Sequence, residues 1–238
     1  MIELEKLVHL QGAVLWLPCT ILLFAASSAL YRRLNKAPLV NPTLLTIAGL
    51  VVILASAGVP YKSYFESVAV LHYLLGTAVV ALALPLYRNV GRLTGRSMGM
   101  AAALVAGSLT SILVGLSVAI LAHASASTVL SLAPKSATAA VSMEISRIIG
   151  GAPAVTATLT ILTGIIGAIT GPYVLDILRI VEPEARGFAM GVASHGIATA
   201  RAFSEGEIAG SFAGLGMVLN AILTALVVPP VVRLFGYG

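Results

Sequence analysis

The chain has 238 residues, of which 58% are hydrophobic and only 10% charged, and its mean hydropathy is +1.02. An ordinary soluble domain is about half apolar and roughly a quarter charged, so this composition excludes a soluble globular protein. It predicts an all-α, polytopic membrane protein whose surroundings are the lipid bilayer. The formal net charge of +5 does not indicate nucleic-acid binding, because the basic residues concentrate in two short loops.

Several long apolar runs carry few or no charges. A bilayer-crossing helix needs about 20 apolar residues, and most of the runs reach that length. They are 12–30, 44–58, 74–86, 98–122, 155–175 and 212–232. Together with two more polar segments described below, they predict seven or eight spanning helices. The number is eight if segment 132–146 crosses the membrane and seven if it only dips in and returns.

Two loops between the early runs are basic and contain no acidic residue. Their basic residues are Arg32, Arg33 and Lys36 in the first loop and Arg88, Arg92 and Arg96 in the second. The positive-inside rule places both loops in the cytoplasm. Two spans separate the loops, so the amino terminus is predicted outside. The expected location is the inner (plasma) membrane, with several passes.

The first 30 residues predict a spanning helix that is retained. The leader MIELEK carries two acids and one base, and the apolar run after it ends in basic residues. A cleaved signal peptide usually has a basic start and a shorter apolar run. The only cysteine, Cys19, lies in this run, so an intrachain disulfide is excluded.

A weak internal repeat divides the chain into halves near 1–123 and 124–238, within one integral membrane domain, 1–238. Several residues of the first half recur in order about 112 to 116 positions later. The pairs are Pro18 with Pro134, Arg32 with Arg147, Gly49 with Gly164, Pro60 with Pro172, and Gly76 with Gly191. Carriers are often built from such repeats, with the substrate site at mid-membrane between broken helices.

The segment LAPKSATAAVSMEIS, 132–146, is the first of two polar stretches in the second half. Pro134 lacks a backbone N–H and disfavours helical geometry at the residue before it, so we expect a helix to begin here with free N–H groups. A helix start favours anions. The polar side chains that we expect around a carboxylate or phosphate are Lys135, Ser136, Thr138 and Glu144.

The second polar stretch, GVASHGIATARAF at 191–203, combines small residues with ionisable ones. His195 and Thr199 share a face if the segment is helical, and Ser194 and Arg201 share another. Ionisable groups within a span are costly and usually face a cavity or a partner. We therefore predict a broken or re-entrant helix whose polar groups join those of 132–146 in one pocket.

Structural roles are the alternatives for each of these residues. Lys135 would then extend to the membrane surface, and Glu144 would pair with Arg147 and Arg201 with Glu205 at helical spacing. The chain lacks a phosphate-binding Gly-rich loop, a His-Glu-x-x-His motif and a dinucleotide motif. We therefore predict no enzymatic activity, no metal and no cofactor, with an intramembrane hydrolase as the alternative.

The order of these motifs resembles the LrgB/CidB family of bacterial membrane proteins. The similarity runs from about Leu15 to the end and includes LLG…VALALPLY, LAPKS…MEIS, ILTGIIGA and GVASHGI.TARA. The chain also resembles the carboxy-terminal half of the plastid glycolate/glycerate translocator. It departs from the family pattern at Ala198, where members commonly have Gly, and at Thr77, where they commonly have Pro.

The resemblance implies two functions. The first is a secondary transporter of small monocarboxylates of the pyruvate, glycolate or glycerate kind, working by alternating access. The alternative is a holin/antiholin-like modulator of murein hydrolase activity and autolysis. A smaller LrgA/CidA-type membrane partner is implied as well, and we expect a homo-oligomer.

Overall fold

The computed structural model describes residues 2–35, 37–93 and 95–237, and in these ranges it contains helices and turns but no strand. The chain separates into two compact units, residues 1–81 (unit 1) and 82–238 (unit 2). This boundary differs from the repeat boundary expected near residue 123. The single domain and its two halves stay predictions.

Unit 1 is a small group of helices packed on a long amino-terminal one. Its elements are α1 (Ile2–Arg33), η1 (Pro38–Val40), α2 (Pro42–Ser56), α3 (Tyr61–Ser67) and α4 (Ala69–Ala81). Helix α2 begins at Pro42 because the side chain of Asn41 accepts hydrogen bonds from the N–H groups of Thr43 and Leu44. Buried Leu50, Leu54, Tyr64 and Val68 form the core.

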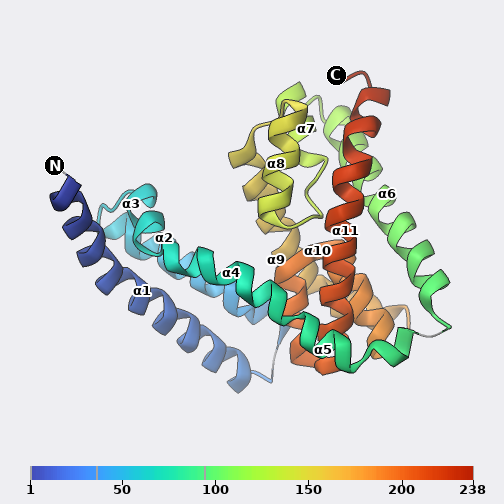
Figure 1. Cartoon of the computed structure of the whole chain (residues 1–238), viewed down its shortest axis with the longest axis horizontal. Coiled ribbons are helices and arrows are strands. Elements are labelled where there is room, and N and C mark those ends of the chain that lie inside the picture. The colour runs from blue at the N-terminus through green and yellow to red at the C-terminus, as the bar shows by residue number, and fades with distance from the viewer. Residues whose placement is uncertain (1, 36, 94, 238) are drawn as a thin grey trace. The chain divides into compact units, whose positions relative to one another are not determined.

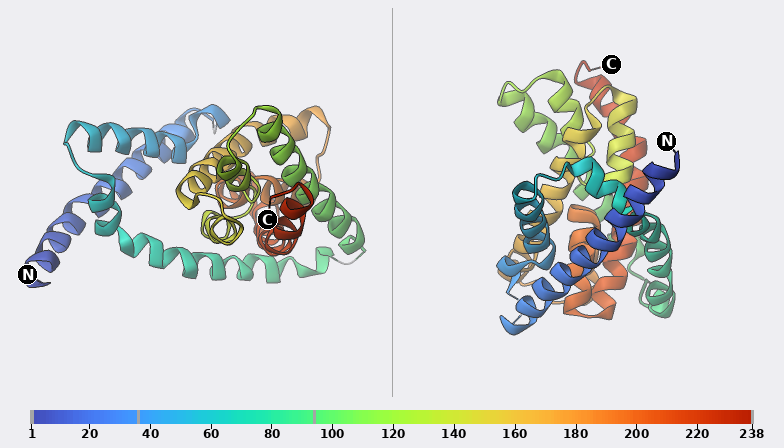
Figure 2. Two further views of the ribbon diagram at one scale, coloured as in Figure 1. Left: turned by 90° about the horizontal axis from the view of Figure 1, so that it is seen from above. Right: turned by 90° about the vertical axis from the view of Figure 1, so that its left-hand side faces the viewer.

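Unit 2 contains both polar segments. Its elements are α5 (Ala83–Arg88), η2 (Val90–Leu93), α6 (Ser97–Leu121), α7 (Ala126–Leu132), α8 (Ala139–Ile149), α9 (Pro153–Ile177), α10 (Pro183–Glu205) and α11 (Glu207–Leu234). Figure 1 and the right view of Figure 2 agree that α7 and α8 lie beside the carboxy-terminal half of α11, while α10 lies beside its amino-terminal half.

The expected number of spanning helices was too high. Four described helices are long and apolar enough to cross a membrane, and the pair of α2 and α3, bent by 120°, makes a fifth if it counts as one span. The four are Val14–Arg33, Ser97–Leu121, Pro153–Ile177 and Glu207–Leu234. The difference arises because α4 has only 13 residues, α7 and α8 are short, and α10 is interrupted.

Helix α10 is a hairpin of two half-helices. The Nε of Arg186 donates to Oε2 of Glu205 at 3.1 Å, although 19 residues separate them. A straight helix would put those residues about 28 Å apart. The chain reverses at Ser194 (φ −146°, ψ 26°) and His195 (φ 43°, ψ −139°), where helical geometry is lost. The expectation of a broken helix in 191–203 is confirmed at these two residues.

The segment formed by α7 and α8 also returns to the end of unit 2 from which it started. Arg92 and Arg96, just before α6, both pair with Glu184 in the first turn of α10. The start of α6 and the connection from α9 to α10 therefore lie at one end of unit 2. Helices α6 and α9 each run the length of unit 2, with 25 residues apiece. The stretch between them therefore begins and ends at the opposite end. We call these two segments the α7–α8 hairpin and the α10 hairpin.

Close packing fixes the α10 hairpin against α11. A Cβ added at Gly187 or Gly191 would overlap with the backbone of Ala209 or Ala213, so only glycine allows the two helices to approach this closely. Because residue numbers increase together along this contact, the first half of α10 runs parallel to the start of α11. The second half runs back, with Thr199 beside Met217 and Phe203 beside Gly210.

Candidate functional site

Lys135 lies at the tip of the α7–α8 hairpin and reaches toward the middle of α6. Its Nζ donates to the backbone oxygen of Ser111 at 2.9 Å and to the Ser111 hydroxyl at 3.1 Å. Gly115 leaves room for the ammonium group, since a Cβ there would lie 3.0 Å from Nζ. Lys135 is thus half-buried and held by hydrogen bonds to α6.

The same tip presents the amino terminus of α8. Thr138 precedes the helix but its side chain makes no capping hydrogen bond, so the N–H groups of the first turn have no intrahelical or capping partner. The hydroxyl of Ser142 donates to the backbone oxygen of Pro134 at 2.6 Å and holds the tip in place. Ser136 is 1% exposed, and its hydroxyl has no partner among the described residues. The tip therefore brings together a cationic group, a buried hydroxyl and the amino terminus of a helix.

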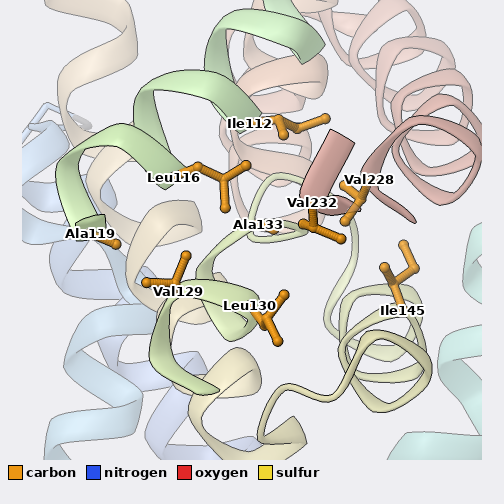
Figure 3. Packing of buried hydrophobic residues seen from close by; sticks show 9 residues of the cluster. All are labelled: Ile112, Leu116, Ala119, Val129, Leu130, Ala133, Ile145, Val228 and Val232. Atoms are coloured by element: carbon orange, nitrogen blue, oxygen red, sulfur yellow. The ribbon is translucent and has the colours of Figure 1, made fainter. Parts of the chain in front are cut away.

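Apolar packing holds this tip against α6 and α11. Figure 3 shows Ala133, just before Lys135, among side chains that point toward one another from α6, α7, α8 and α11. Its neighbours in the cluster are Ile112, Leu116, Ala119, Val129, Leu130, Ile145, Val228 and Val232. The tip is consequently a packed element of unit 2.

His195 occupies the tip of the α10 hairpin. It is 5% exposed, and its Nε2 lies 2.9 Å from the backbone oxygen of Thr160 on α9. A carbonyl oxygen only accepts hydrogen bonds, so Nε2 carries a proton in this contact. Gly164 makes space for the ring, because a Cβ there would lie 2.6 Å from Cε1. The positive φ of His195 is unusual for a side chain of this size and marks the break as a constrained point.

Ser194 and Thr199 are the polar neighbours of His195 in the α10 hairpin. Ser194 is 3% exposed and fits over Gly167, where a Cβ would overlap with its hydroxyl. Thr199 donates to the backbone oxygen of His195 at 2.8 Å. His195 and Thr199 share the second half-helix, as expected from their spacing. Ser194 lies at the break, so the helical face predicted for Ser194 and Arg201 does not exist.

Glu144 and Arg201 lie away from the two tips. Glu144 pairs with Arg147 at 2.6 Å on the exposed face of α8, where their side chains are 55% and 70% exposed. Arg201 lies 3.9 Å from Glu205 near the base of the α10 hairpin. Both residues follow the structural alternative derived from their spacing. Neither residue lies at a tip, and the single pocket expected from the sequence stays a prediction.

Two polar residues beside the Lys135 tip were not predicted from the sequence. Asn220, in the middle of α11, is fully buried and donates from Nδ2 to the backbone oxygen of Ser136 at 2.9 Å. Its Oδ1 accepts a hydrogen bond from the Ser108 hydroxyl on α6. A single amide within the apolar run 212–232 was the available signal, because polar groups within a span usually have a specific partner.

Charged residues pair with one another at the base of the α10 hairpin, at the end of unit 2 opposite the base of the α7–α8 hairpin. Glu184 is 6% exposed and lies 2.8 Å from Arg92 and 3.3 Å from Arg96. A hydrogen bond from its own backbone N–H holds the pKa of the Glu184 carboxyl below its usual range, and the two arginines lower it further, against the opposing effect of burial. The carboxylate is therefore charged at neutral pH and ties the start of α10 to the start of α6.

These features define an all-helical membrane protein with two helical hairpins. The chain belongs to the LrgB-like family, whose model matches residues 20–234. It is 33% identical to the holin-like protein CidB of Staphylococcus epidermidis, over 94% of this chain and 97% of the relative. The holin-like protein CidB of Staphylococcus aureus is 31% identical over the same shares, and the uncharacterized protein YwbG of Bacillus subtilis is 34% identical over 88% and 93%. No solved structure matches the chain.

Proposed function

We propose that the chain is a secondary carrier of small monocarboxylates such as pyruvate, glycolate or glycerate. One observation carries this proposal: unit 2 contains two helical hairpins whose bases lie at opposite ends and whose tips carry the buried polar groups. Inverted repeats with interrupted helices are typical of secondary transporters, which bind substrate at mid-membrane and open alternately to either side.

The Lys135 tip is the proposed carboxylate site. The ammonium group of Lys135, the free N–H groups at the start of α8 and the Ser136 hydroxyl, with Thr138 beside them, offer positive charge and hydrogen-bond donors. A carboxylate accepts hydrogen bonds only, so it matches such a set of donors. The α8 dipole adds to the attraction.

The His195 tip is the proposed moving partner of that site. Its Ser194, His195 and Thr199 are held by α9 and by the second half-helix itself, and both half-helices pack on α11. Movement of one hairpin relative to the other would expose the carboxylate site to one side at a time. In this proposal the basic connection at Arg88, Arg92 and Arg96 faces the cytoplasm of a plasma-membrane protein, and the amino terminus lies outside.

The second candidate is a holin-like modulator of murein hydrolase activity and autolysis. The relatives named holin-like protein CidB favour it, since they match this chain nearly end to end. Such a function would use an oligomer and an LrgA/CidA-type membrane partner. Small residues that could contact another chain, Gly210 and Gly214, lie on one face of α11. This face is not free for oligomerisation, because it packs on Phe203 and Leu82 within unit 2.

Uptake by reconstituted vesicles separates the two candidates. The carrier proposal expects saturable uptake of labelled pyruvate or glycolate, reduced about 10- to 100-fold by Lys135→Met, because a charge-assisted hydrogen-bond partner is lost. Arg147→Met is the matched control, since Arg147 is also a cation of the α7–α8 hairpin but lies exposed. Release of an entrapped dye without saturable uptake, equal in both variants, would favour the holin-like candidate and contradict the carrier.

A further inference from the structure

Asn220 shows which face of α11 meets the carboxylate site. Its amide bridges the backbone of Ser136 at the hairpin tip and the hydroxyl of Ser108 on α6. Four residues further on, Thr224 lies on the same face of the helix. Val228, four residues beyond Thr224, packs with Ala133 and Ile145 of the hairpin (Figure 3). Thr224 is therefore flanked by two residues that both contact the α7–α8 hairpin, and it faces that hairpin.

The hydroxyl of Thr224 differs from those of most threonines in the long helices of unit 2. Thr158, Thr163 and Thr170 on α9 each donate to the backbone oxygen four residues earlier, at 2.8 to 3.1 Å. This local bond is the usual way for a hydroxyl to be satisfied within an apolar helix. Thr224 is fully buried, yet its hydroxyl has no partner among the described residues.

Two more buried hydroxyls have no partner among the described residues: that of Ser136 at the hairpin tip and that of Thr160 on α9. Unpartnered buried hydroxyls are rare because each one loses its hydrogen bonds to water on folding. Ser136 lies at the hairpin tip, and Thr224 lies on the face of α11 whose residues Asn220 and Val228 contact the hairpin, so one bound molecule can supply a partner to both hydroxyls. A hydroxyl both donates and accepts, so it suits a keto oxygen as well as an alcohol.

We infer that Thr224 is a specificity-determining residue, which recognises an oxygen on the carbon next to the substrate carboxylate. This inference rests on the proposed carrier function and deepens it. Lys135 and the start of α8 hold the carboxylate, and the Thr224 hydroxyl then selects 2-oxo and 2-hydroxy acids over the unsubstituted acid of the same length. Asn220 acts as a positioning residue that keeps the tip and α11 in register.

Competition measurements on the reconstituted full chain test this inference. Uptake of labelled pyruvate is measured with unlabelled pyruvate or propionate as competitor, and the ratio of their inhibition constants is the specificity. We expect Thr224→Val, which keeps the shape but lacks the hydroxyl, to reduce this ratio about tenfold, the size expected when one hydrogen bond is lost. Thr224→Ser restores the hydroxyl and should restore the ratio.

Thr170→Val provides the control, because the Thr170 hydroxyl already donates to the backbone oxygen of Ile166. This substitution should leave the ratio unchanged. An unchanged ratio in Thr224→Val, with saturable pyruvate uptake intact, would overturn the role of Thr224 while the carrier stands. The inference would also fall if the wild-type chain bound propionate as well as pyruvate. No saturable uptake by the wild-type chain would overturn the carrier proposal itself.

Discussion

Arg186, near the start of α10, and Glu205, its last residue, are joined by an ion pair with Nε and Oε2 3.1 Å apart. Nη1 of Arg186 also reaches Asp176 in α9, at 2.7 Å. One guanidinium group thereby connects both ends of the α10 hairpin with the end of α9. The reversal of α10 at Ser194 and His195 depends on this arrangement, because it holds the two half-helices together at their base.

Arg186→Gln should destabilise the protein by about 2 kcal/mol, since it breaks charge-assisted hydrogen bonds of a side chain that is only 14% exposed. Thermal unfolding of the detergent-purified protein measures the change. Arg147→Gln removes an arginine whose pair with Glu144 is exposed to solvent, and surface pairs of that kind contribute little. Equal effects of the two substitutions would contradict the role given to Arg186.

The ion cluster at Glu184 predicts a specific pH dependence. A carboxyl whose folded pKa is lowered contributes stability that is complete above its ordinary pKa of about 4.5 and is lost as the pH falls through the lower folded value. Glu184→Gln should therefore unfold at a lower temperature than the wild-type chain at pH 7, and this gap should close at strongly acid pH. A gap that stays constant down to acid pH would mean that the charge of Glu184 is not the cause.

The contact between α10 and α11 requires glycine at one position and tolerates a side chain at another. Gly191→Ala places a methyl group against the backbone of Ala213, which cannot move aside as a side chain would. We expect a loss of about 1–3 kcal/mol in the free energy of unfolding. Gly196→Ala is the control, because among the described residues the added Cβ would approach the sulfur of Met217 alone, at 3.9 Å. Chemical denaturation of both variants compares them directly.

Local features of the polar segments were predictable from the sequence. Pro134 indicated a helix start beside Lys135 and Ser136, but Ala133 before it keeps helical geometry (φ −53°, ψ −49°) at the end of α7, and α8 begins only at Ala139. The small residues of 191–203 indicated a broken helix, and the break lies at Ser194 and His195. The break was predictable because it rests on backbone properties of residues close in sequence, whereas the proline placed the helix start only approximately.

Features that depend on distant contacts were not predictable in this way. The reversal of α10 relies on Arg186 meeting Glu205, and the return of the α7–α8 hairpin is evident only from the contact of Arg92 and Arg96 with Glu184. Hydropathy measures whether a segment is apolar and how long it is, but not whether the chain turns back. For the same reason Asn220 was missed, since its importance comes from a partner 84 residues away.

The α7–α8 hairpin enters and leaves at one end of unit 2, opposite the base of the α10 hairpin, and the proposed carrier mechanism depends on this arrangement. Labelling with a membrane-impermeant thiol reagent in a Cys19→Ser background tests it. Single cysteines replace Ala122 and Arg147, at the two ends of the α7–α8 hairpin, or Asn89 and Leu178, at the other end of unit 2. Cysteines at Ala122 and Arg147 should react from one face of the membrane, and those at Asn89 and Leu178 from the other. Reaction at Ala122 and Arg147 from opposite faces would show that the segment crosses the membrane and would contradict a hairpin that enters and leaves at one end of unit 2.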